Sequence, residues 1–272
     1  MPEASRIART FASLKRAAFM PFFTIGDPDL ETTEALVREA ARRGADLIEL
    51  GVPFSDPIAD GPTIQASYYR ALEKGFKVAQ VFELARKLRA GGVTIPLVCM
   101  VSETLVFRRG AGAFFKELKA AGYDGAIVPD LPAGYEGDAT AQARAHGLDH
   151  IFLCAPTTPA ERRELIAGRG SGFIYYISVA GLTGARAALP PDLEANVKDL
   201  KARTKTPVAV GFGIGTPEQA AAVGRIADGV IVGSALVKLA AELHAAGRSR
   251  DETVAEVGAR VEALARGARG EA

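Results

Sequence analysis

The chain has 272 residues, of which 48% are hydrophobic and 24% charged, values that exclude a disordered or fibrous protein. Its formal net charge is +1, and its Lys and Arg residues are scattered, so neither nucleic acid nor an anionic membrane is an expected partner. Residues 1–16 carry charges throughout, and no apolar run reaches membrane-spanning length. These features predict a cytoplasmic protein that acts on a small molecule.

Short apolar runs alternate with amphipathic segments of helical spacing along the chain. The runs are apolar almost continuously, which is typical of parallel strands covered on both faces. The expected strands are 19–25, 47–52, 96–101, 125–128, 150–154, 173–177, 207–211 and 229–232. The expected helices are 31–43, 78–89, 111–121, 139–146, 159–167, 192–203, 217–226 and 251–266, followed by a frayed tail at 267–272.

Eight such units predict one closed (β/α)₈ barrel, the TIM barrel, as a single domain spanning residues 1–272. The alternative is an open doubly wound sheet, which usually has a glycine-rich turn after its first strand. Here the first strand leads into Gly26-Asp27-Pro28 instead, which favours the barrel. Glycines that follow helical segments are expected to end those helices, and they are Gly44, Gly91, Gly122, Gly147 and Gly168.

A charged residue interrupts the second expected strand near its carboxyl end, where barrel enzymes place their active sites. Alternation puts Leu47 and Glu49 on one face of that strand, so one face must bury a carboxylate. A structural glutamate paired with an arginine or a backbone amide is the alternative interpretation. The following loop, rich in proline, brings Asp56 and Asp60 back over the barrel mouth, which favours acid-base chemistry by carboxylates.

Glycine-rich turns follow the last two expected strands. Gly211-Phe212-Gly213 and Gly233-Ser234 leave backbone amides accessible, as a phosphate site at this end of a barrel requires. Ordinary tight turns would have the same composition. Cys99 and Cys154 lie inside apolar runs and are expected in the core. His146, His150 and His244 lack metal-ligand spacing, so neither a metal nor a cofactor is expected.

Residues 48–65, Ile-Glu-Leu-Gly-Val-Pro-Phe-Ser-Asp-Pro-Ile-Ala-Asp-Gly-Pro-Thr-Ile-Gln, resemble the signature of the tryptophan synthase alpha chain family. The likeness extends to segments 22–27, 128–132, 180–184, 211–214 and 233–238, and covers almost the whole chain. The resemblance implies a lyase that cleaves indole-3-glycerol phosphate to indole and glyceraldehyde 3-phosphate. It also implies a pyridoxal-phosphate beta chain as partner, in a tetramer of two alpha and two beta chains.

The resemblance assigns roles residue by residue. Glu49 is the acid-base residue at the reacting carbon and hydroxyl, and Asp60 accepts from the ring nitrogen. Tyr175 is the third catalytic residue implied. The residues expected to hold the rest of the substrate are Phe22, Ile64, Met100, Ile127, Leu153, Thr183 and Phe212 around the indole, and Gly184, Gly213, Gly233 and Ser234 around the phosphate. Residues 178–190 resemble a lid.

Two alternatives stay open from the sequence. Another phosphate-binding barrel enzyme, such as a sugar-phosphate isomerase, would use the same glycine turns. The second alternative is a chain that mainly binds and activates a beta partner. The presence of Glu49, Asp60, Tyr175 and Thr183 argues against it. One departure from the family concerns the partner-facing loop, where Ser102-Glu103-Thr104 replaces the usual Tyr, any residue, Asn. That change leaves open an adapted interface, weaker coupling, or a free-standing lyase.

Overall fold

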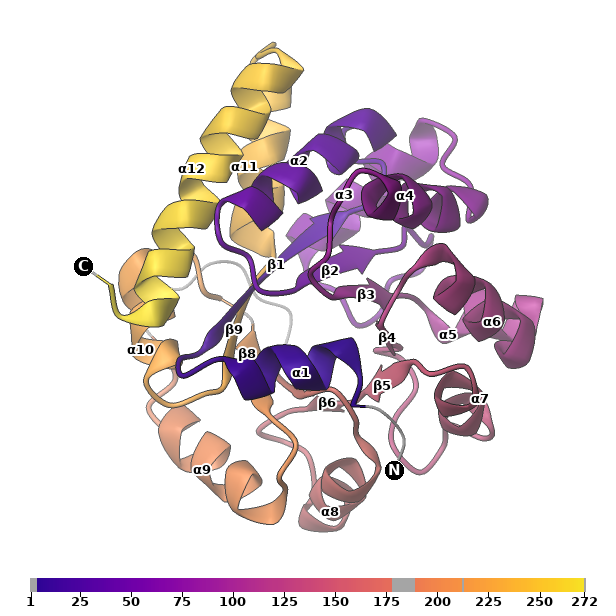
Figure 1. Cartoon of the computed structure of the whole chain (residues 1–272), viewed down its shortest axis with the longest axis vertical. Coiled ribbons are helices and arrows are strands. Elements are labelled where there is room, and N and C mark those ends of the chain that lie inside the picture. The colour runs from indigo at the N-terminus through magenta and orange to yellow at the C-terminus, as the bar shows by residue number, and fades with distance from the viewer. Residues whose placement is uncertain (1–3, 178–188, 212, 272) are drawn as a thin grey trace.

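A computed structural model describes residues 4–177, 189–211 and 213–271. Within them, parallel strands form one sheet in the order β5-β4-β3-β2-β1-β9-β8-β7-β6, surrounded by helices (Figure 1). The strands are β1 (Ala18–Thr24), β2 (Ile48–Gly51), β3 (Leu97–Met100), β4 (Gly125–Ile127), β5 (Asp149–Ile151), β6 (Leu153–Cys154), β7 (Ile174–Ile177), β8 (Val208–Gly211) and β9 (Gly229–Val232).

The fifth expected strand is divided into β5 and β6 at Phe152. Strand β5 pairs with β4, and β6 pairs with β7. The backbone carbonyl of Phe152 accepts a hydrogen bond from the amide of Tyr175 at 3.0 Å. The two ends of the sheet are therefore joined by consecutive residues, and the ring closes as the predicted TIM barrel rather than as an open sheet.

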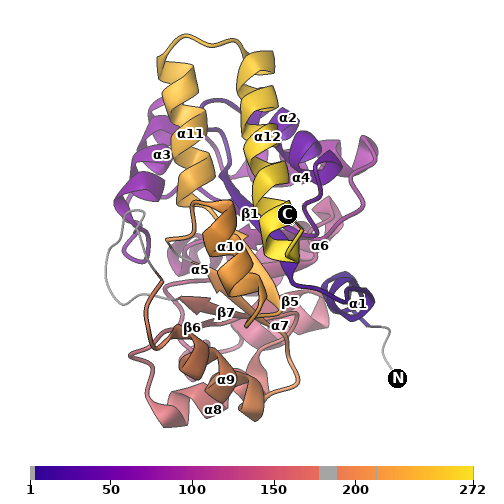
Figure 2. The same ribbon diagram turned by 90° about the vertical axis from the view of Figure 1, so that its left-hand side faces the viewer.

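Helices form the outer layer of the barrel (Figures 1 and 2). Four of them, α1, α3, α5 and α11, lie outside the ranges expected to be helical. The helices are α1 (Arg6–Ser13), α2 (Leu30–Arg42), α3 (Pro62–Glu73), α4 (Ala79–Ala90), α5 (Glu103–Arg109), α6 (Ala111–Ala121), α7 (Ala139–Ala145), α8 (Ala160–Arg169), α9 (Leu193–Arg203), α10 (Pro217–Gly224), α11 (Ser234–Ala245) and α12 (Arg250–Arg269).

Alternation along each strand separates two apolar layers. On β1, Met20 and Phe22 belong to a cluster inside the barrel, whereas Phe19 and Phe23 belong to the larger cluster between the strands and the helices. Both cysteines are buried, as expected, in that outer cluster. Because the inner cluster fills the lower part of the barrel, the open space that remains lies at the carboxyl ends of the strands.

Two expectations about where helices end were wrong. Gly168 lies within α8 rather than after it, although Gly122 does end α6 in the left-handed conformation, with φ of +107°. The tail does not begin to fray at 267, because α12 continues to Arg269 and buries Gly267 and Ala268. A Cβ on Gly267 would collide with the backbone of Pro217 in α10, so the close packing of these two helices requires a glycine there.

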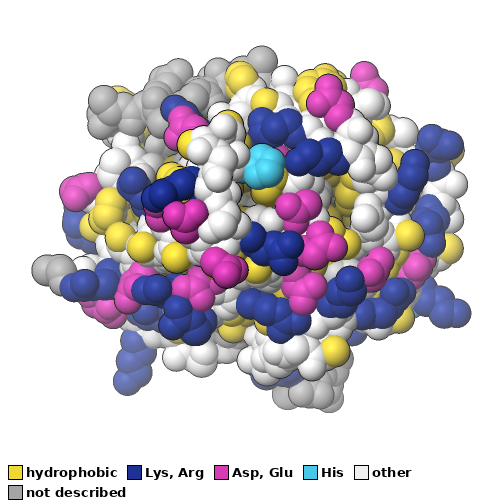
Figure 3. Space-filling model, turned by 90° about the horizontal axis from the view of Figure 1, so that it is seen from above, with side chains coloured by type: hydrophobic (Ala, Val, Ile, Leu, Met, Phe, Trp, Pro, Cys, Tyr) yellow, Lys and Arg dark blue, Asp and Glu magenta, His cyan; other side chains and the backbone are white. Residues whose placement is uncertain are grey.

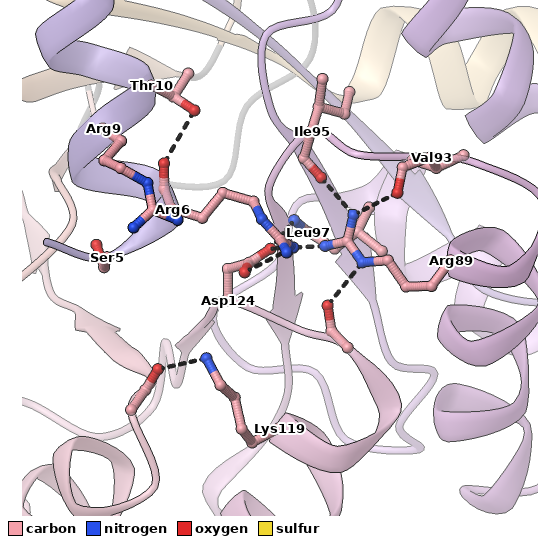
Figure 4. A network of polar contacts seen from close by, with 12 residues as sticks. Ser5, Arg6, Arg9, Thr10, Arg89, Val93, Ile95, Leu97, Lys119 and Asp124 are labelled. Carbon is pink, nitrogen blue, oxygen red and sulfur yellow. Dashed lines mark hydrogen bonds and ion pairs between the residues drawn. The ribbon is translucent and has the colours of Figure 1, made fainter. Parts of the chain in front are cut away.

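At the face of the barrel formed by the amino ends of the strands, aspartate side chains accept hydrogen bonds from neighbouring strands. Asp124, directly before β4, accepts from the backbone amide of Leu97 in β3 at 3.0 Å. It also accepts from the guanidinium groups of Arg6 and Arg89 at 3.0 and 2.7 Å (Figure 4). The carboxylates of Asp46 and Asp228 bind the starts of β1 and β8 in the same way. These contacts hold the strands in register at their amino ends, whereas the active sites of such barrels lie at the carboxyl ends of the strands.

Charged side chains of both signs are mixed on the surface (Figure 3). In the face drawn in Figure 3, basic and acidic side chains are interspersed without a large patch of one sign. Among the described residues, no helix is both long and apolar enough to cross a membrane.

Candidate active site

Glu49 projects from β2 into the barrel beside Phe22 of β1 and Val98 of β3, its register partners. It is 1% exposed, and neither carboxylate oxygen has a hydrogen-bond partner among the described residues. Burial raises the pKa of Glu49 to about 8. The alternative of a structural glutamate held by an arginine or a backbone amide therefore has no support in the geometry. At neutral pH Glu49 is a protonated acid.

Asp60 lies in the loop between β2 and α3, directly before the helix's N-cap Gly61. The loop is fixed by its backbone, since the amide of Asp60 donates to Pro57 at 3.1 Å and its carbonyl accepts from Gln65 at 2.8 Å. Burial, with the nearby charge of Asp130 as a second cause, raises the pKa of Asp60 to about 7. Burial therefore raises the pKa of both carboxyl groups, and Asp60 loses its proton at lower pH than Glu49.

A single pocket at the carboxyl ends of the strands contains both carboxyl groups. It encloses about 770 Å³ of empty space, including the open solvent at its mouth. Its described lining comprises Phe22, Glu49, Ala59, Asp60, Ile64, Met100, Pro129, Leu153, Tyr175, Ile177, Gly213, Ile214, Ile231, Gly233, Ser234 and Ala235. Asp56 lies outside this pocket and is exposed.

Tyr175 faces the inside of the barrel and Tyr176 the helices, as alternation requires. A Cβ on Gly211 would lie 2.5 Å from the Tyr175 hydroxyl, so glycine at the end of β8 makes room for the phenol. Burial and the charges of Glu49 and Asp60 raise the pKa of Tyr175. The phenol thus stays protonated and can donate a hydrogen bond inside the pocket.

One side of the pocket is suited to an anion. Gly213, which has φ of +77°, lies there together with Gly233 and Ser234 at the start of the twelve-residue helix α11. The first amides of a helix are free to donate, and the helix dipole favours negative charge. This is where the sequence predicted the phosphate.

Some expected site residues are not in the pocket lining. Ile127 is fully buried in the inner cluster and does not line the pocket. Thr183, Gly184 and Phe212, and most of the expected lid, lie outside the described residues. Sequence reasoning missed Ile177 and Ile231, although both lie near the ends of strands and Ile231 is on the inward face, where alternation could have found it.

Ser102-Glu103-Thr104, the departure from the family pattern, forms the start of α5. Ser102 is the N-cap of that helix, and its hydroxyl donates to Asp130 at 2.7 Å, while the amide of Glu103 donates to the same carboxylate at 2.8 Å. Asp130 was not predicted as a site residue. Its charge nevertheless acts on Asp60 across a smaller neighbouring cavity that both residues line.

No group of three or more His, Cys, Asp or Glu side chains in the described part of the chain is arranged to hold a metal ion. The buried histidine, His150, shares a hydrogen bond of 2.7 Å with the Thr140 hydroxyl and packs beside Phe152 with ring centroids 4.5 Å apart. It therefore has a packing role, as expected from the sequence.

Comparison with known proteins assigns the family. The model of the family "Tryptophan synthase alpha chain" matches residues 9–268. The chain belongs to the tryptophan synthase alpha chain family. The alpha chain of Rhodopirellula baltica is 48% identical over 85% of each chain, and that of Citrifermentans bemidjiense is 47% identical over 97% of each.

Solved structures of the family have the same fold. The crystal structure of tryptophan synthase subunit alpha from Legionella pneumophila matches with a TM-score of 0.90 at 35% identity, covering 98% of this chain and all of that one. A structure of Mycobacterium tuberculosis tryptophan synthase matches with a TM-score of 0.87 at 37% identity, covering 98% and 99%. The predicted family and the predicted fold are both confirmed.

Proposed function

We propose that this protein is the alpha subunit of tryptophan synthase, the lyase that cleaves indole-3-glycerol phosphate to indole and glyceraldehyde 3-phosphate in tryptophan biosynthesis. The observation that carries the proposal is a pair of buried carboxyl groups, Glu49 and Asp60, with no salt bridge to either among the described residues, in one largely apolar pocket that the start of α11 also lines. An indole ring fits the apolar walls, and a phosphate fits the amides of Gly213, Gly233 and Ser234.

The proposed reaction uses the two carboxyl groups in different protonation states. Protonated Glu49 donates a proton to the ring carbon that bears the glycerol chain, and the ionised carboxylate of Asp60 accepts from the ring N–H and stabilises the resulting cation. Glu49 then removes the proton of the adjacent hydroxyl. The oxygen's electron pair forms the aldehyde, the carbon-carbon bond breaks, and its electrons restore the aromatic ring. Glu49 ends protonated, as it began.

Four residues complete the proposed site. Tyr175 donates to the polar part of the substrate near the reacting carbon. Thr183 and Gly184 contribute from the segment that resembles a lid, and Phe212 from the turn after β8, as the family resemblance implies. If the phosphate site is correct, sulfate soaked into crystals will bind against Gly213 and Ser234. Sulfate found only elsewhere would contradict it.

A beta chain is the partner that family membership implies. We infer that two alpha and two beta chains form a cytoplasmic tetramer, with the pyridoxal phosphate held by the beta chain. Exposed apolar side chains support a docking face, since Ile58, in the loop that carries Asp60, is 80% exposed and Phe107, on α5, is 76% exposed. The molar mass of the purified complex, measured by light scattering, tests the stoichiometry.

The products test the function. Purified protein, with and without its beta chain, is incubated with indole-3-glycerol phosphate, and indole and glyceraldehyde 3-phosphate are quantified. We expect the two products in equal amounts. A sugar-phosphate isomerase would instead convert its substrate without releasing indole, and a chain that only activates its partner would form no indole in either sample. Either result would overturn the proposal.

A further inference from the structure

Tyr68 lies on the inward face of α3, one turn after Ile64. Both side chains belong to the cluster inside the barrel, and Tyr68 is 3% exposed. Its hydroxyl is close to the backbone of Gly51, because a Cβ on that glycine would lie 2.8 Å from the phenol oxygen. Gly51 ends β2 two residues after Glu49. The phenol therefore reaches the carboxyl end of the strand that carries the catalytic acid.

Tyr68 also lines the smaller cavity next to the substrate pocket. That cavity encloses about 300 Å³ and is bounded by Asp60, Met100 and Asp130 as well as by Tyr68. The Tyr68 hydroxyl donates no hydrogen bond to any residue that the structure describes. Because Asp60 lines the same cavity, its carboxylate is a suitable acceptor for this phenol.

We propose that Tyr68 is a positioning residue, whose hydroxyl donates a hydrogen bond to the Asp60 carboxylate while that carboxylate accepts from the substrate's ring nitrogen. The inference rests on the proposed function. A phenol is suited to this position because it is a neutral donor. It stabilises the ionised carboxylate without placing a competing cation beside the cationic intermediate, as a lysine or arginine would.

The surroundings of Asp60 explain why it needs such a donor. Burial and the charge of Asp130 both raise the pKa of Asp60, to about 7, so near neutral pH a large fraction would be protonated and unable to accept from the ring N–H. Burial, followed by the charge of Asp60, raises the pKa of Tyr68 well above its ordinary value, so the phenol keeps its proton. The ionisable groups around this pair in the described chain are Glu49, Asp56, Cys99, Asp130 and Tyr175.

Tyr68→Phe removes the hydroxyl and keeps the ring. Its kcat/KM for indole formation is measured against pH beside wild type. We expect the acid limb to move to higher pH by about one unit, which corresponds to one hydrogen bond to a charged group, so activity below the limb falls about tenfold. Tyr69→Phe is the matched control, because the neighbouring tyrosine is half exposed and its hydroxyl donates to the Ser55 carbonyl. It should behave as wild type.

An unchanged acid limb in folded Tyr68→Phe would overturn the inference, and so would a loss of activity equal at every pH, which indicates only a structural role. A second readout does not depend on turnover. Isotope-edited infrared titration of the Asp60 carboxyl group should show a higher pKa in Tyr68→Phe than in wild type, and equal values would again overturn the inference. If wild type forms no indole, the proposed function fails, and this titration still tests the hydrogen bond.

Discussion

The burial of Glu49 makes the stability of the fold depend on pH. Its pKa is raised from 4.5 to about 8 by burial, so the folded state binds the proton more tightly than the unfolded state. The stability associated with this group is complete below about pH 4.5 and is lost as pH rises through about 8, by at most about 1.4 kcal/mol per pH unit.

Glu49→Gln cannot ionise and should therefore stabilise the fold at alkaline pH. We expect the melting temperature of the variant to exceed that of wild type by an amount that grows from pH 5 to 8 and then levels. Thermal unfolding across that range measures it, with the exposed Glu242→Gln as control. A difference that does not change with pH would show that Glu49 is already ionised in the folded protein.

The same residue was predictable from sequence because a charge in a continuous apolar strand has few structural explanations. How deep each side chain lies within the barrel was not predictable from the sequence. Ile127 and Met100 are register partners and both face inward, yet only Met100 lines the pocket, because the strand pattern gives the face of a side chain and not whether it reaches the open space. Tyr68 was missed because it lies on α3, which was not among the expected helices, and follows the end of the motif at 48–65.

At the scale of elements, replacing Asp124 tests how side-chain contacts hold the amino ends of the strands. Its side chain is 6% exposed and connects α1, α4 and the start of β3. Asp124→Ala should destabilise the fold by about 3 kcal/mol, because it leaves Arg89 and a buried amide without their acceptor. Activity per folded molecule should not change, since the site is at the other end of the barrel.

Urea denaturation measures this loss, and Glu242→Ala, which removes an exposed ion pair with Lys238, should change little. A similar effect of both variants would mean that the network around Asp124 contributes no more than a surface pair.

Strand and helix order followed from periodicity, but helices α1, α3, α5 and α11 lie outside the expected ranges. Helices α1 and α5 have eight and seven residues, too few for a reliable helical pattern. Helix α3 begins at Pro62 without a side-chain cap hydrogen bond, so the usual starting signal is absent. The division of the fifth strand at Phe152 depends on pairing with two different neighbours, which no local pattern reveals.

For the whole molecule, coupling to the proposed beta chain is the property that we expect the Ser102-Glu103-Thr104 change to affect. These residues start α5 and bind Asp130, whose charge acts on Asp60. We expect the beta chain to raise indole turnover tenfold to a hundredfold, which requires about 1.4 to 2.7 kcal/mol of preferential binding to the active arrangement. Steady-state rates with and without the beta chain measure this. Equal rates would identify a free-standing lyase.

We propose above all that Glu49 and Asp60 perform the acid-base chemistry from one pocket. The most direct test compares indole formation from indole-3-glycerol phosphate by wild type, Glu49→Gln and Asp60→Asn, each with saturating beta chain and each shown to be folded by circular dichroism. Both variants should lose at least about 100-fold in turnover, as expected when a general acid or base is removed. If either folded variant keeps most of its activity, that residue does not carry the reaction and the claim is wrong.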